Sequence, residues 1–261
     1  MKYEERAPSP QFAPFIERFW AFGTEACDPE SYEHVIVPDG TANIAVIEPM
    51  PGGPFVSVAG PSPVAVRVPV QRGLTYRGAR IRSGAWRAVM GSDVIGLVGQ
   101  KMPMMMLSPE LGAAIQSACG GADSLSRFAE GFEAALSGRP DHGLLDAEVC
   151  ALAQKLVDSD GFAAMSDLMA SSAIGERQLR RRFQRETGLS PKVFARLRRV
   201  RRACIDLAYQ RSGNVATISA DHGYADQPHF TRELKAVFGM SPLQLRAYLD
   251  QIRHFNLLEL C

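Results

Sequence analysis

The C-terminal part of the chain contains a sequence that occurs twice, the second copy lying 51 residues after the first. The matched pairs are Leu179 and Phe230, Arg181 and Arg232, Phe183 and Leu234, Gly188 and Gly239, Ser190 and Ser241, and Pro191 and Pro242. Each copy follows an amphipathic segment and a turn that contains glycine. A helix, a short glycine-containing turn and a polar helix are the layout of a helix-turn-helix unit. The repeat therefore predicts two such units in one chain.

The segment between the two copies, PKVFARLRRVRRACIDLAYQ, predicts one long helix from about residue 191 to 210. Its apolar side chains form a stripe at helical spacing, with arginines around it. The stripe consists of Phe194, Leu197, Val200, Cys204 and Leu207. Such a helix spans roughly 30 Å, and successive major-groove exposures on one face of B-DNA lie about 34 Å apart. We therefore expect the two units to reach two groove segments about one turn apart.

Charge is divided unevenly along the chain. Residues 162–249 contain 15 Lys and Arg and 7 Asp and Glu, which gives +8. The rest of the chain contains 29 − 15 = 14 basic and 28 − 7 = 21 acidic residues, which gives −7. A basic segment joined to an acidic one indicates that only the C-terminal part meets a polyanion, although a solvated helical surface would show the same excess.

The second helix of each predicted unit has one apolar and one polar face. In the second copy Asp226 is a suitable N-cap, and Phe230, Leu234 and Phe238 recur every four residues and are expected to pack inward. The outward residues expected at DNA base edges are Gln227, Thr231 and Arg232 in this copy, and Arg177, Gln178, Arg180 and Arg181 in the first. The residues expected at phosphates are Arg182, Arg185 and Lys235.

The stretch GYADQPHFTRELKAVFGMSP resembles the signature of AraC/XylS-type transcription regulators, and QLRRRFQRETGLSPKVF resembles their first recognition helix. The resemblance covers about residues 146–250. It implies two helix-turn-helix subdomains joined by a long helix. The base-contacting positions that it implies are Arg177, Arg180, Arg181, Gln227, Pro228, Thr231 and Arg232. The chain departs from the family pattern at Ser219 and His222, where apolar residues are usual, and at Pro228, whose side chain donates no hydrogen bond.

The N-terminal part predicts β-structure. Short runs rich in Val and Ile, such as TANIAVI and VAVRVPV, alternate with Pro- and Gly-containing turns over residues 1–90. The aromatic segment FAPFIERFWAFG fits either a short helix or a first strand, and helical patterns begin near residue 105. RFWAFG, VIVPDGTANIAV and GARIRSGAWRAVMG resemble a domain of unassigned function that is fused to AraC-type modules. That resemblance implies effector binding or dimerisation.

The predicted fold class is α+β, with a barrel- or sandwich-like β-rich domain followed by an all-α domain. We expect the β-rich domain, with a few helices, over residues 1–137. A linker at 138–145 contains GRPDHG, the DNA-binding domain covers 146–250, and a tail covers 251–261.

Enzyme functions are the alternative to DNA binding. A metal-dependent cupin needs two or three His and a carboxylate on adjacent strands, and the β region contains only His34. A thiol that accepts alkyl groups would be expected among clustered cysteines, but the five cysteines lie apart, at positions 27, 119, 150, 204 and 261. We therefore expect no enzymatic activity, no cofactor and no metal. A third alternative is a basic surface that binds an acidic protein.

Double-stranded DNA is the expected partner. RNA polymerase, a small-molecule effector and a second copy of the chain are further candidates. No apolar run approaches the roughly 18–20 residues of a membrane helix, and the N-terminus MKYEERAPSP lacks the apolar stretch of a signal peptide. Scattered cysteines without a C-x-x-C pair fit a reducing compartment, so we expect a cytoplasmic protein with no membrane partner.

Overall fold

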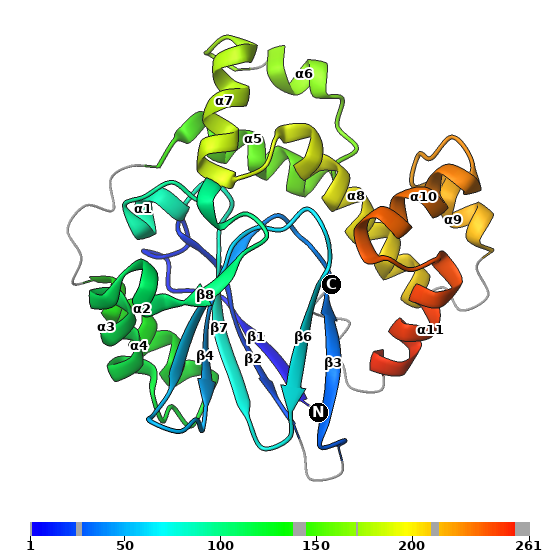
Figure 1. Cartoon of the computed structure of the whole chain (residues 1–261). Helices are drawn as coiled ribbons and strands as arrows, with labels where there is room; N and C mark the ends of the chain where they lie inside the picture. Colours follow the sequence, from blue (N-terminus) through cyan, green and yellow to red (C-terminus); the bar gives the residue numbers. More distant parts are fainter. Residues whose placement is uncertain (1, 25–27, 138–144, 171, 210–213, 254–261) are drawn as a thin grey trace.

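The computed structural model describes residues 2–24, 28–137, 145–170, 172–209 and 214–253. Its strands are β1 (Lys2–Arg6), β2 (Ile16–Gly23), β3 (Ser31–Ile36), β4 (Ala42–Glu48), β5 (Phe55–Ala59), β6 (Val66–Gln71), β7 (Thr75–Ile81) and β8 (Lys101–Pro103). Its helices are α1 (Trp86–Met90), the 3-10 helix η1 (Ile95–Leu97), α2 (Met104–Leu107), α3 (Pro109–Cys119), α4 (Leu125–Ser137), α5 (Ala147–Asp158), α6 (Met165–Ala170), α7 (Glu176–Thr187), α8 (Pro191–Tyr209), α9 (Val215–Asp221), α10 (Gln227–Phe238) and α11 (Pro242–Arg253). The β-rich first part and the helical second part confirm the predicted α+β class (Figure 1).

Six strands form one antiparallel sheet in the order β1-β2-β7-β4-β5-β8. Alternate residues of a strand point to the same face, so Phe19, Ile44 and Ala79 share one buried face, which packs in a common core with α3 and α4. The rings of Phe19 and Phe128 meet edge-on there, with their centroids 6.1 Å apart. The aromatic segment that fitted either a helix or a strand is therefore strand β2, because its alternating residues are needed for this core.

Strands β3 and β6 pair with each other and form a separate two-stranded ribbon. The ribbon lies against the other face of the six-stranded sheet, where His34 of β3 stacks on Phe22 of β2 with ring centroids 6.4 Å apart. Among the described residues the outer edges of β1 and β8 pair with no further strand. A closed barrel requires its edges to pair, so the barrel form of the prediction is wrong and the layers form an open sandwich.

The helices of the two repeat copies occupy matching positions, and α7 and α10 are offset by 51 residues at both ends. Both end at a glycine in the left-handed conformation, Gly188 with φ 75° and Gly239 with φ 69°, where a side chain would be strained. Helices α8 and α11 begin at the matched prolines Pro191 and Pro242, and α8 ends at Tyr209. The two helix-turn-helix units and their connecting helix are confirmed. No helix in the described ranges has the length and apolar character needed to cross a membrane.

One hydrophobic core is continuous between the ribbon and the C-terminal helices. Val35 and Val37, in and just after β3, belong to the same buried cluster as Phe194 of α8 and Leu245 of α11. The predicted domain boundaries stay predictions. Residues 138–144 of the expected linker and 254–261 of the expected tail lie outside the described residues.

A hydrogen-bonded contact joins α11 to the ribbon. The Tyr248 hydroxyl accepts a hydrogen bond from the Val35 N–H at 2.7 Å and lies 3.1 Å from Nδ1 of His34, which accepts its proton when the imidazole is neutral. His34 is 6% exposed. Burial lowers the pKa of His34 from 6.5 to about 4. The neutral imidazole is therefore part of the contact between the β-rich and helical parts.

We predict that acid destabilises the folded chain through His34. The pKa of the His34 imidazole is higher in the unfolded chain than in the folded chain. The contribution of the neutral imidazole to the free energy of unfolding is therefore complete above about pH 6.5 and is lost as the pH falls toward 4. Between pH 7 and 4 the free energy of unfolding of the wild type should fall by about 3 kcal/mol more than that of His34→Gln. Urea unfolding across this pH range measures the difference, and equal pH dependence of the two proteins would contradict the prediction.

Candidate nucleic-acid interface

Helix α7 presents a basic face to solvent. Leu179 and Phe183 are buried, and the Phe183 ring meets that of Phe194 on α8 edge-on at 5.6 Å. The opposite face is exposed and carries Arg177, Gln178 and Arg181. The apolar spacing therefore holds α7 on α8 and turns three of the four residues predicted at base edges outward.

Helix α10 repeats this arrangement in the second unit. Its N-cap is Asp226, whose carboxylate accepts a hydrogen bond from the His229 N–H at 2.6 Å. Phe230, Leu234 and Phe238 are buried, as predicted. The residues on its outer side are Gln227, Pro228, Arg232 and Lys235, which are exposed, and Thr231, which is half-buried. Pro228 lies in the first turn of α10, where its missing N–H breaks no helical hydrogen bond.

The basic residues of the two helices differ in their partners. Arg180 pairs with Glu176 at 2.7 Å, and Arg185 pairs with Glu186 at 2.8 Å. Arg182 pairs with the buried Asp146, the N-cap of α5, at 2.5 Å. By contrast, four basic residues have no ion-pair partner in the part of the chain that the structure describes. They are Arg177, Arg181, Arg232 and Lys235.

Position 182 in the first copy corresponds to Glu233 in the second, because both lie at the same place in the repeat. Glu233 lies 3.8 Å from Arg196 of α8, so this position attaches the recognition helix to its own subdomain in both copies. The sequence pattern predicted this role for neither Glu233 nor Asp146. The signal that could have indicated this role is a charged residue at the same place in both copies, Arg182 and Glu233.

Polar partners accommodate the two departures from the family pattern before α10. Ser219 is buried, and its hydroxyl donates to the carbonyl oxygen of Asp226 at 3.1 Å. His222 is also buried; its Nε2 lies 2.8 Å from the carboxylate of Asp206 on α8, and its ring stacks on Phe162. The second unit therefore packs with a partly polar interface.

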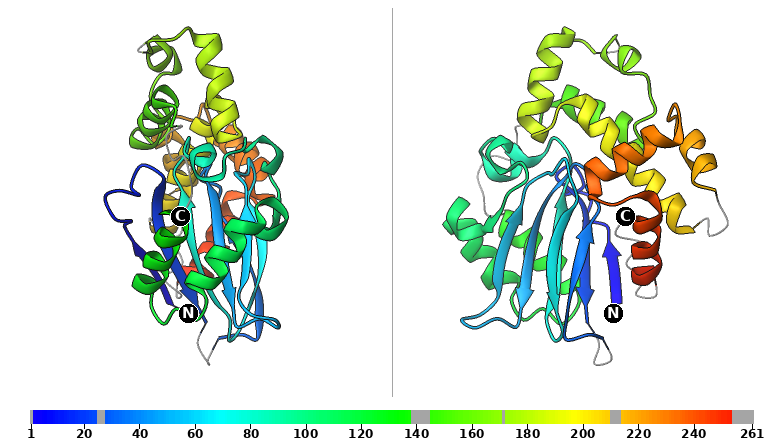
Figure 2. Two further views of the ribbon diagram at one scale, coloured as in Figure 1. Left: turned by 90° about the vertical axis from the view of Figure 1, so that its left-hand side faces the viewer. Right: turned by 45° about the vertical axis from the view of Figure 1, so that its right-hand side comes forward.

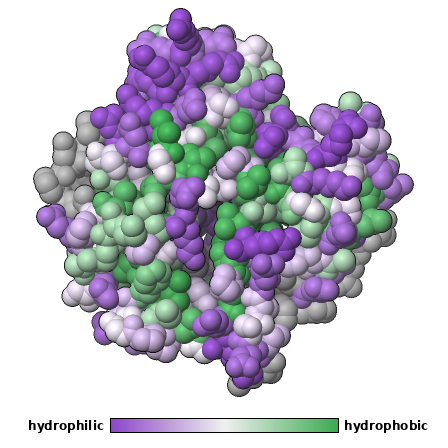
Figure 3. Space-filling view, viewed as in Figure 1, coloured by the Kyte–Doolittle hydropathy of each residue, from purple (hydrophilic) through white to green (hydrophobic). Residues whose placement is uncertain are grey.

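The outer surface of both units is hydrophilic. Figure 3 shows hydrophilic residues gathered over α6 and α7 at the top and over α9 and α10 at the right, in the orientation of Figure 1. The chain therefore presents two polar recognition surfaces. The five arginines of α7 outnumber its two glutamates, and α10 adds the exposed Arg232 and Lys235, which suits contact with a polyanion.

Two thiols, and the His, Cys, Asp and Glu residues that could bind a metal, test the enzyme alternatives. Burial raises the pKa of Cys119 to about 12, and burial together with Asp146 and Glu186 raises the pKa of Cys150. Alkyl acceptance needs a thiolate at neutral pH, which both environments disfavour. No group of three His, Cys, Asp or Glu residues suited to a metal ion occurs among the described residues.

Two families match the chain. Residues 168–248 match a helix-turn-helix domain, HTH_18, which is AraC-type, and residues 4–103 match a domain of unknown function, DUF6597. No curated protein matches the chain at a significant level. The C-terminal region is therefore an AraC-type helix-turn-helix domain, and a β-rich domain of unassigned function precedes it.

Solved structures of ToxT from Vibrio cholerae are similar over most of the chain. ToxT from strain O395 has 10% identity and a TM-score of 0.42, over 95% of this chain and 96% of that one. The same protein bound to (E)-4-(8-methylnaphthalen-1-yl)but-3-enoic acid has 10% identity and a TM-score of 0.43, over 95% and 100%. ToxT from strain SCE256 bound to an unsaturated fatty acid has 12% identity and a TM-score of 0.39, over 88% and 90%.

The ion pair between Arg182 and Asp146 predicts a difference between neighbouring arginines. Arg182→Ala leaves the buried Asp146 carboxylate without its cation and should lower the free energy of unfolding by about 1–2 kcal/mol. Arg181→Ala, on the exposed face, should change it by less than about 0.5 kcal/mol. Urea unfolding of both variants measures this, and equal losses would show that the pair does not stabilise the first unit.

Proposed function

We propose that this chain, whose C-terminal region is an AraC-type helix-turn-helix domain, is a sequence-specific transcription regulator that places α7 and α10 in two adjacent major-groove segments. The observation that carries this proposal is the structural repeat: both helices bury the same apolar positions and expose the same arginine position, 181 and 232. An arginine at a recognition-helix surface without an internal partner is free to bind guanine bidentately.

The residues proposed to read bases are Arg177, Arg180 and Arg181 on α7, and Gln227, Pro228, Thr231 and Arg232 on α10. Gln227 suits adenine, whereas Pro228 offers only an apolar contact. The residues proposed to contact phosphates are Arg182, Arg185 and Lys235. Since a guanidinium has five N–H donors, an arginine with an internal carboxylate partner retains donors for a phosphate.

The length of α8 supports simultaneous binding by both units. Its 19 residues span about 28 Å, against about 34 Å between successive groove exposures. Both units contact this one helix, the first at Phe194 and the second at Arg196 and Asp206. Helices α7 and α10 lie apart, at the top and at the right of the right-hand view in Figure 2. One chain can therefore contact both segments from the same side of the duplex.

RNA polymerase and a second copy of the chain are further partners that we propose. Regulation of transcription would bring the DNA-bound chain near RNA polymerase, and a second copy would double the number of groove segments. The alternative of an acidic protein partner predicts that duplex DNA does not compete with that partner. The thiols of Cys119 and Cys150, whose pKa values are raised, give the alkyl-transfer alternative no support.

The first test is selection of binding sites from random duplexes with the full chain, followed by Arg181→Ala and Arg232→Ala. Each variant should lose about 1–3 kcal/mol of binding free energy and relax base preference in its own half of the site only. Arg67→Gln, an exposed arginine of β6 far from both helices in the sequence, is the control and should bind as the wild type does. If both variants lose base preference at the same position of the site, the two-groove arrangement is contradicted.

A second test changes the DNA. Insertion of five base pairs between the two half-elements rotates one of them to the far side of the duplex, because one turn is about 10 base pairs. Affinity should fall to that of a single half-element, whereas insertion of a full turn tests the reach of α8 without changing the face. If the half-turn insertion leaves fluorescence-anisotropy titrations unchanged, one chain does not bind both half-elements.

A further inference from the structure

A crevice of about 350 Å³ lies between the β-rich part and the first helix of the C-terminal part. Its walls are the turn between β1 and β2, the first residues of β2, the loop between β7 and α1, and one face of α5. This volume falls within the range of small-molecule sites in proteins. The crevice is therefore large enough for a small organic molecule that contacts both parts of the chain.

An irregularity in β2 directs two consecutive charged residues to this crevice. Ile16 pairs with Ile81 and Arg18 pairs with Arg80, so Glu17 is an extra residue in the strand. Such a bulge changes the alternation of side chains between the two faces. Ile16 stays fully buried in the core, while Glu17 and Arg18 both line the crevice.

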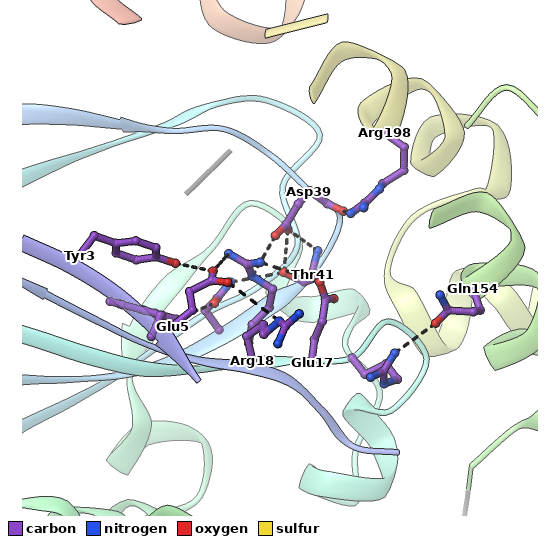
Figure 4. A network of polar contacts seen from close by, with 12 residues as sticks. Tyr3, Glu5, Glu17, Arg18, Asp39, Thr41, Gln154 and Arg198 are labelled. Carbon is purple, nitrogen blue, oxygen red and sulfur yellow. Dashed lines mark hydrogen bonds and ion pairs between the residues drawn. The ribbon is translucent and has the colours of Figure 1, made fainter. Parts of the chain in front are cut away.

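Glu17 and Arg82, two charged residues of the crevice wall, differ in the groups that surround their charges. The Glu17 carboxylate lies 3.8 Å from the Arg80 guanidinium, which it shares with Asp39 at 3.2 Å and Glu5 at 3.9 Å. Arg82 donates from Nε to the carbonyl oxygen of Ala13 at 2.8 Å and from Nη1 to the amide oxygen of Gln154 at 3.1 Å, and both acceptors are uncharged. The bond from Arg82 to Gln154 is drawn at the right of Figure 4. The positive charge of Arg82 is therefore available to an anion.

A second cation and an unpaired hydroxyl add to the wall. The guanidinium of Arg18 is 49% exposed, and its carboxylate neighbour within the described ranges is Glu5, at 3.9 Å. The buried Ser83 hydroxyl has no hydrogen-bond partner there. Ala153 and Val157 of α5 supply apolar surface. Two cations, a hydroxyl and an apolar wall suit a carboxylate attached to a short apolar body.

We propose that this crevice is an effector site for a small organic monocarboxylate; as an effector site it rests on the proposed function. One wall, α5, holds recognition helix α7 through the ion pair between Asp146 and Arg182. A second connection leads to α8, because Arg80 lies between Glu17 and Asp39, whose carbonyl oxygen accepts a hydrogen bond from Arg198 (Figure 4). A molecule bound to both walls therefore acts where the β-rich part meets the DNA-binding part.

The test uses the full chain with benzoate, phenylacetate and hexanoate at millimolar concentration, each compared with its neutral amide. A carboxylate that binds the folded state raises the melting temperature in a saturable way. Arg18→Gln should weaken that binding about tenfold, which corresponds to about 1.4 kcal/mol. Arg67→Gln is the matched control, because its side chain is 48% exposed and the charge change is the same. Ala7→Trp, at an exposed residue of the crevice wall, should block binding without altering the core.

The outcomes separate this site from the proposed function. Stabilisation of the wild type by a carboxylate but not by its amide, with loss in Arg18→Gln and Ala7→Trp and retention in Arg67→Gln, supports the site. If none of the three carboxylates stabilises the wild type, or if the two Gln variants respond equally, the site is refuted. The bound carboxylate should also change DNA affinity, and DNA should change carboxylate affinity by the same factor. Carboxylate binding without any duplex binding refutes the regulator, and duplex binding that ignores a bound carboxylate refutes the effector role.

Discussion

The junction between the two parts of the molecule depends on the burial of Arg80 beside Asp39. Arg80 lies in the middle of the six-stranded sheet and is 7% exposed, and a buried guanidinium requires an opposite charge nearby. The Asp39 carboxylate lies 3.2 Å from its Nε. Burial alone would raise the pKa of Asp39, but Arg80 and two hydrogen bonds from Thr41 hold it below its usual range. These contacts fix the loop between β3 and β4.

That loop in turn fixes α8 to the sheet. Gly40 has a φ of 81°, and a Cβ at this position would lie 2.6 Å from the ring of Phe194, so only glycine allows the loop to approach the helix this closely. Both helix-turn-helix units pack on α8, and each also contacts the β-rich part. Arg87 of α1 lies 3.6 Å from Glu186 of α7, and the loop before β6 donates a hydrogen bond to α10. The β-rich part is therefore placed to influence how far apart the recognition helices lie.

Much of the DNA-binding domain could be predicted from sequence because its signals are local. Apolar spacing of four residues placed Phe230 and Leu234 in the core. The glycines matched by the repeat, Gly188 and Gly239, are the residues at which α7 and α10 end. The partners of charged residues could not be predicted, since a carboxylate such as Asp146 meets Arg182 across two helices. The barrel alternative failed for a similar reason: strand patterns identify strands, but they do not tell which edges pair.

The sequence by itself determined the two helix-turn-helix units, their connecting helix and the arginines on their outer faces, because helix periodicity and capping residues act over a few positions. Tertiary structure alone decided which of those arginines remain without a partner, and that the β-rich part shares a core with α8 and α11. It also decided that a bulge in β2 turns Glu17 and Arg18 toward α5. Each of these features depends on groups brought together from distant parts of the chain, where burial and charge compensation, not local spacing, select the arrangement.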